Sequence, residues 1–118
     1  MAFKSLLGIA FVSLATACAS TAAPHGQLAA SQAAIRAANE LGAGSVPKAA
    51  LHLQMAREGT EKAEKLMAQK ENEAAQFVLM RAEADAELAL ALAKEASAQK
   101  DAQAAMDKVK DVKAKVAE

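Results

Sequence analysis

The C-terminal part of the chain, from Glu73 to about Ala117, contains no proline and no glycine. Apolar residues recur along it every seven positions, and a second row fills most of the intermediate positions. The first row is Phe77, Ala84, Ala91, Ala98, Ala105 and Val112, and the second is Leu88, Ala102, Val109 and Val116, interrupted by Arg81 and Glu95. This repeat of small apolar residues predicts a helix of about 45 residues, roughly 68 Å long, with a seam for a closely packed partner helix.

Composition favours thin helices over a thick globular core. The sequence has no Trp, no Tyr and three Phe, and about three residues in ten are Ala. Alanine is the strongest helix former because it loses no side-chain entropy, but it buries little area. The 14 basic and 14 acidic residues balance. Without a basic patch or an aromatic platform, the sequence does not indicate a nucleic-acid partner.

Two shorter helices precede the long one. Apolar residues at helical spacing run from Gln27 to Leu41 and stop at the glycines of "GAGS". Pro47 suits the first turn of a second helix, and the polar stretch "AQKENEAA" predicts a tight turn near residues 70–72 with Asn72 as the cap of the third helix. We therefore expect one helical domain over residues 27–118, with helices over about 27–42, 46–69 and 72–117.

Helix lengths predict the architecture. A second helix of about 24 residues is roughly 36 Å long, so in a hairpin it reaches only as far as the region around Ala93. We expect an all-α fold, an antiparallel helical hairpin or three-helix bundle, with a long coiled-coil-like C-terminal helix extending past it. Leu53, Phe77 and Leu88 are expected among its few large buried side chains.

Residues from about Glu95 to Ala117 are expected to project past the bundle with their apolar seam uncovered. A helix with such a seam requires a partner, either a second copy of the chain in a homo-oligomer or a different protein. The predicted partner interface consists of Ala98, Ala102, Ala105, Val109, Val112 and Val116.

The N-terminus has the layout of an export signal, predicted over residues 1–17. Lys4 precedes an apolar core from Leu6 to Ala15, and small residues follow. The core is too short to span a bilayer, which needs about 20 apolar residues. Residues 18–26, "CASTAAPHG", are small and polar and predict a flexible tether.

Cys18, the single cysteine, follows this core in the stretch Ala15-Thr16-Ala17-Cys18. The stretch resembles the lipobox of bacterial lipoproteins, which directs lipid attachment to the cysteine and cleavage just before it. The resemblance implies that Cys18 is lipidated and that the chain is attached to a membrane through this lipid. Cleavage by an ordinary signal peptidase after Ala17 or Ala19 is the alternative, because "ATA" and "ACA" both have the small-x-small pattern.

The helical region carries a second resemblance, through its Ala-rich first helix, the segment "GAGSVPKAAL", the charged second helix and "RAEADAELALALA". These features resemble the bacterial DUF4398 family, a domain of unknown function in exported, often lipid-anchored envelope proteins. In longer members it precedes an OmpA-type peptidoglycan-binding domain. The resemblance implies an envelope location; the family has no established activity, so no functional residues are carried over.

No arrangement of residues indicates catalysis, a cofactor or a metal. His25 and His52 have no Cys or carboxylate at metal-ligand spacing around them, so we interpret both as solvated or hydrogen-bonded. Alternate positions on a helix point to different sides, and Glu83, Asp85 and Glu87 are therefore expected on a solvated face. We expect the protein not to be an enzyme.

These observations favour a lipid-anchored protein of the bacterial outer membrane that faces the periplasm and acts structurally or as an adaptor through helix–helix contacts. Ala19, directly after the cysteine, fits outer-membrane sorting. The alternative is a soluble periplasmic helical protein that binds clients in the apolar seam, as a chaperone does. A third possibility resembles the murein lipoprotein, which bonds to peptidoglycan through a C-terminal Lys. This chain ends "KAKVAE", so no motif supports peptidoglycan association.

Overall fold

The structure is a computed structural model, and it describes residues 21–117. Helix α1 spans His25–Glu40, a short 3-10 helix η1 spans Ala43–Ser45, α2 spans Pro47–Ala68, and α3 spans Asn72–Val116. All regular structure in the described residues is helical, which confirms the all-α prediction.

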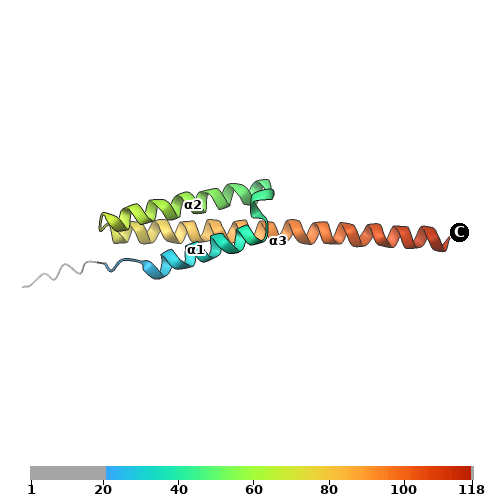
Figure 1. Ribbon diagram of the computed structural model, residues 1–118, viewed down its shortest axis with the longest axis horizontal. Coiled ribbons are helices and arrows are strands. Elements are labelled where there is room, and N and C mark those ends of the chain that lie inside the picture. Colours follow the sequence, from blue (N-terminus) through green and yellow to red (C-terminus); the bar gives the residue numbers. More distant parts are fainter. Residues whose placement is uncertain (1–20, 118) are drawn as a thin grey trace, which may run out of the picture.

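The three α-helices form a bundle at one end of α3 only. Helix α2 runs antiparallel to α3, and α1 lies along both, as Figure 1 shows. The second half of α3 continues past the bundle without a neighbouring helix in the described part of the chain (Figure 1). A three-helix bundle with an extended C-terminal helix is therefore the observed architecture, as the helix lengths predict.

The connection from α1 to α2 is made by glycine and proline. Gly42 has a φ of +74°, and its N–H donates to the Asn39 carbonyl oxygen at 2.9 Å. Only glycine adopts this left-handed conformation without steric cost. Val46 is extended and Pro47 is the first residue of α2, where its missing N–H removes no helical hydrogen bond. The chain therefore reverses within six residues of the end of α1.

The turn from α2 to α3 reverses the chain without glycine. Lys70 takes the left-handed conformation, with a φ of +63°. Its N–H donates to the Met67 carbonyl at 3.0 Å, and the N–H of Glu71 donates to the Leu66 carbonyl at 2.9 Å. These are the two hydrogen bonds of a Schellman motif, which satisfies the last carbonyls of α2.

The prediction that Asn72 caps α3 is wrong. Glu71 occupies the N-cap position, and Asn72 is the first residue of the helix. The side-chain amide of Asn72 instead donates to the Thr21 carbonyl at 2.6 Å. This contact is tertiary and 51 residues apart in sequence, so the local pattern around Asn72 could not reveal it.

The core consists mainly of alanine. On α3 the buried residues form one row with alternating spacings of four and three; we call it the inner row, and it comprises Ala75, Leu79, Ala82, Ala86, Ala89 and Ala93. On α2 the buried residues are Ala49, Leu53, Ala56, Thr60 and Ala63. Because small side chains face each other, the helices approach closely, and Leu53 and Leu79 are the largest side chains that are at least 98 % buried.

Midway along the bundle, two buried hydroxyls form a hydrogen bond and α2 lies close against α3. The Ser31 and Thr60 hydroxyls are buried and 2.7 Å apart, and the Thr60 hydroxyl donates to the Ala56 carbonyl at 2.8 Å. A hydroxyl has one proton, so Ser31 donates to Thr60. Directly before Thr60, α2 carries Gly59, which lies beside Ala82 of α3. Helices α1, α2 and α3 are therefore joined here with little free space.

Candidate functional site

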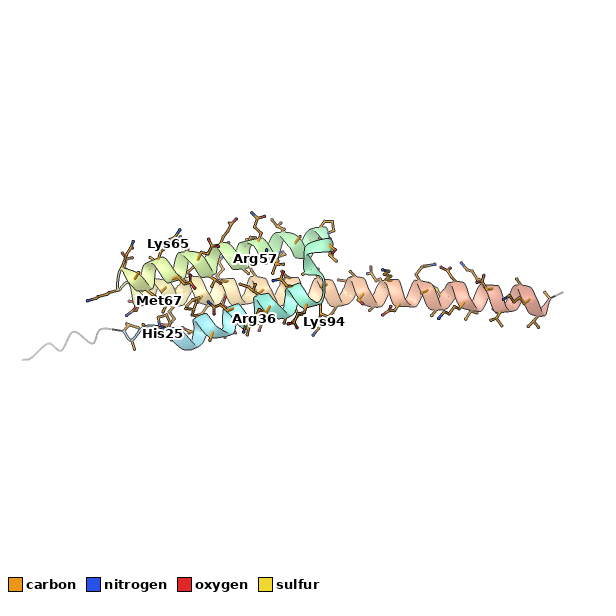
Figure 2. All side chains as sticks on the ribbon, viewed as in Figure 1. His25, Arg36, Arg57, Lys65, Met67 and Lys94 are labelled. Carbon is orange, nitrogen blue, oxygen red and sulfur yellow. The ribbon has the colours of Figure 1, made fainter. Side chains whose placement is uncertain are left out.

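The second half of α3 stands free of the bundle; we call residues 97–116 the C-terminal arm. Ala93 is the last buried residue of α3, and every residue of the arm is exposed. Lys94, labelled in Figure 2, marks the end of the bundle, and beyond it side chains surround α3 on all sides. The arm therefore begins where the helix lengths predict.

All six residues of the predicted partner interface lie on this arm, and all are exposed. A helix turns about 100° per residue, which places them on one side of α3. The opposite side of the arm carries charged residues, namely Lys100, Asp107 and Asp111. The arm is an amphipathic helix with an uncovered apolar side.

The exposed apolar side continues back along the bundle. Phe77 is 65 % exposed, Met80 54 % and Leu88 43 %. With the exposed Ala84 and Ala91 they extend the apolar side of the arm toward the start of α3. We call the whole set the outer stripe: Phe77, Met80, Ala84, Leu88, Ala91, Ala98, Ala102, Ala105, Met106, Val109, Val112 and Val116.

The outer stripe lies on the opposite side of α3 from the inner row. Residues two positions apart, such as Ala82 and Ala84, point about 200° apart on a helix; the first is buried and the second exposed. Helices α1 and α2 cover the side of the inner row. Helix α3 therefore has two opposite apolar sides, one of them unpartnered in the described residues.

The prediction that Phe77 and Leu88 are buried is wrong, whereas Leu53 is buried as predicted. Both rows of α3 repeat every seven residues, and the bulkier row contains Phe77 and Leu88. The bundle instead uses the row of smaller residues, because helices packed at alanine distance have no space for a phenylalanine between them. Leu79, which the bulkier row omits, is fully buried in their place.

A charged edge borders the outer stripe. Four exposed residues recur every seven positions along it with alternating sign, and these are Glu87, Lys94, Asp101 and Lys108. Arg81 and Glu95 lie within the apolar repeat itself. Charges at such flanking positions select partner and register in paired helices.

His52 and Asp85 join α2 to α3 beside a shallow depression. The Nδ1 atom of His52 is 2.9 Å from Oδ1 of Asp85, and the two side chains are 27 % and 14 % exposed. The depression is lined by Met55, Gly59, Val78, Arg81 and Ala82, together with Glu58, Lys62 and Asp85. His52 is thus hydrogen-bonded as interpreted, while Asp85 lies at the helix contact and not on a solvated face.

The described residues contain no group of His, Cys, Asp and Glu side chains arranged to hold a metal ion. Within residues 21–117, no helix combines the length and apolarity needed to cross a membrane. Cys18 and the predicted signal segment lie outside the described residues. The first described residue, Thr21, is held against Asn72 by the hydrogen bond of 2.6 Å.

Thr21 and the end of the arm therefore lie at opposite ends of the described part of the chain. Thr21 contacts the first residue of α3, and the arm ends at Val116, the last. At 1.5 Å per residue, the 45 residues of α3 separate these ends by roughly 67 Å. Figure 1 shows the same arrangement, with α1 entering near the start of α3 and the C-terminus at the far end.

Comparison with known proteins identifies a family. Residues 26–105 match the sequence profile of a domain of unknown function, DUF4398. No curated protein and no solved structure matches the chain significantly. The matched segment covers the bundle and the first half of the arm and ends before Val109, Val112 and Val116. Since the match spans most of the chain, the protein belongs to the DUF4398 family.

Proposed function

We propose that the protein is a non-enzymatic, lipid-anchored envelope protein with a structural or adaptor role, and that the outer stripe of α3 binds another helix. One observation carries this proposal: α3 buries one apolar side in its own bundle and exposes a second on the opposite side. That side includes Val109, Val112 and Val116, exposed by 54 %, 59 % and 81 %. Exposed contiguous apolar surface of this kind typically marks an interaction site.

The electrostatic and polar arrangement of the bundle supports a structural role. The Nδ1 atom of His52 on α2 lies at hydrogen-bond distance from Asp85 on α3. The buried hydroxyls of Ser31 and Thr60 satisfy each other. These polar groups therefore hold helices together, and the outer stripe is the surface that remains for function.

Cys18 is the proposed attachment site, at the outer membrane with the domain in the periplasm. The hydrogen bond between Thr21 and Asn72 holds Thr21, three residues after Cys18, at the end of the bundle that lies farthest from the arm, which supports an anchor on that side. The anchor and the binding surface would then not compete for space. Fractionation tests this step: Cys18→Ser should release the chain from membranes, and an unchanged membrane fraction would contradict the anchor and support the soluble periplasmic alternative.

Site-specific photo-crosslinking in cells tests the binding surface. A photoreactive amino acid at Ala105 lies on the outer stripe, and the matched control at Ala104 is exposed on the charged side of the same turn. Crosslinks from position 105 and none from 104 are the expected result. Equal crosslinking from both positions, or none from either, would show that the stripe is not a specific interface.

A further inference from the structure

The outer stripe is much longer than an ordinary helix, which has about 11–12 residues. It extends from Phe77 to Val116 on a helix of 45 residues, whereas α1 has 16 residues and α2 has 22. A helix of equal length and matching apolar repeat is needed to cover it. Helix α3 of a second copy has both properties.

We propose that two copies pair antiparallel along their outer stripes, with the twofold axis between Ala96 and Ser97. Each arm then lies along the outer stripe of the other copy, on the side of its α3 that α1 and α2 leave uncovered. This inference rests on the proposed function and names the partner as a second copy of this chain. Helices α1 and α2 cover the opposite side of α3, where the inner row lies, so they do not obstruct the pairing.

The charged edge fixes the register. Flanking charges of antiparallel helices face each other across the seam. In the proposed register Glu87 lies opposite Lys108 of the second copy, and Lys94 lies opposite Asp101 of the second copy. Symmetry doubles both pairs, so four attractive contacts form along this edge.

Neighbouring registers bring like charges together. A shift of one heptad in one direction places Glu87 opposite Asp101 of the second copy and Lys94 opposite Lys94. The same shift in the other direction places Lys94 opposite Lys108 and Asp101 opposite Asp101. Like charges directly opposed across a helical seam disfavour both alternatives.

The apolar layers also fit this register, because a larger side chain generally meets a smaller one. The layers are Phe77 with Val116, Ala84 with Val109, Leu88 with Ala105, and Ala91 with Ala102, each pair joining the two copies. Alternation of large and small residues allows facing helices to interdigitate. Arg81 and Glu95 face Val112 and Ala98 of the second copy, not their own counterparts.

A parallel pair would be less favourable. In a parallel coiled coil, equivalent seam residues meet, so Arg81 would face Arg81 and Glu95 would face Glu95. At the edges, Lys108 would face Lys113 of the second copy. Each of these contacts opposes two like charges, and none occurs in the proposed antiparallel register.

Disulfide crosslinking distinguishes the two directions. The chain is prepared at full length with Cys18→Ser, so that no native thiol remains, and carries either Ala91→Cys or Ala102→Cys. In the antiparallel pair these two positions face each other, while each lies 11 positions, or roughly 16 Å, from its own counterpart. We expect oxidation to crosslink a mixture of the two variants and to leave each variant alone uncrosslinked.

Charge reversal tests the register independently, by sedimentation. Lys108→Glu places an acidic residue opposite Glu87 of the second copy at both ends of the charged edge. This repulsion should weaken dimerisation about tenfold. Adding Glu87→Lys in the same chain should restore it. Lys100→Glu is the matched control, because it makes the same charge change on the far side of the arm, and it should leave the dimer unchanged.

The proposal is overturned by a monomer at all concentrations, by self-crosslinking of Ala102→Cys, or by the absence of rescue in the double variant. The crosslink from Ala105 in cells separates this failure from failure of the proposed function. A product containing two copies of this chain supports the dimer. A product containing a different envelope protein retains the helix-binding function and overturns the second copy as its partner.

Discussion

A methyl group on Gly59 of α2 would lie 3.0 Å from the Cβ atom of Ala82 on α3. Ala82 is almost fully buried, and its Cβ atom is fixed to the backbone of α3. The two helices can therefore accommodate no additional carbon at this point. Gly59, which weakens α2 as a helix, allows the close contact that holds α2 to α3.

Gly59→Ala should therefore destabilise the bundle by about 1 kcal/mol, although alanine favours the helix by a similar amount. The helices must separate, and the alanine contacts on both sides of the site weaken. The measurement is the free energy of unfolding in urea, followed by circular dichroism. Gly26→Ala in α1 is the control, since no heavy atom lies within 4 Å of its added Cβ; equal stabilisation by both substitutions would contradict the close approach.

Thr60→Val should cost about 1–3 kcal/mol in free energy of unfolding, because it leaves the buried Ser31 hydroxyl without its partner at 2.7 Å. The double variant Ser31→Ala with Thr60→Val removes both hydroxyls and should be more stable than Thr60→Val alone. Chemical denaturation of the two single variants and the double variant measures the coupling. Strictly additive losses would mean that the two hydroxyls contribute independently.

The sequence predicts the helices and the length of the arm because proline, glycine and periodicity act locally. Gly42 and Pro47 lie where α1 ends and α2 begins. The end of the bundle near Ala93 follows from the length of α2 alone. The Lys70 turn also appears at the expected place, although its left-handed residue is not a glycine.

Periodicity does not show which side of α3 is buried. Two opposite rows share the same seven-residue repeat, and residue size favours the wrong one. The distinguishing signal is where each row becomes polar. Beyond Ala93 the inner row continues through Ala96, Lys100, Gln103 and Asp107, whereas the outer row, after Glu95, stays apolar to Val116. The inner row becomes polar beyond Ala93, which lies beside the first residues of α2. It is therefore the row that α2 covers.

The pairing of His52 with Asp85 depends on the register between α2 and α3 and not on local sequence. The two residues are 33 positions apart, and a slip of one helical turn would separate them by about 5.4 Å. This register is set by the turn at Lys70 and by the contact of Gly59 with Ala82. Neither can be located exactly from the sequence pattern.

Leucine substitutions on α3 distinguish its two apolar sides. Leu79 is fully buried, so Leu79→Ala should cost about 2–5 kcal/mol in free energy of unfolding. Leu88 is 43 % exposed, and Leu88→Ala should cost less than about 1 kcal/mol in the monomer. Both free energies are measured by urea denaturation at protein concentrations too low for the dimer to form. The reverse order would mean that the bulkier row, and not the inner row, faces α1 and α2.

Removal of residues 101–118 should leave the bundle intact, because residues 101–117 are all exposed and add no contact to its core. We expect the free energy of unfolding of the monomer to change by no more than about 0.5 kcal/mol, while helical ellipticity falls in proportion to the residues lost. Crosslinking from a photoreactive residue at Ala91, in the retained part of the outer stripe, should be lost with these residues. A loss of several kcal/mol in the isolated monomer would show that the arm stabilises its own bundle, which contradicts its role as a free binding surface. The charged control Lys100→Glu, which keeps the arm at full length, should retain both the stability and the crosslinks.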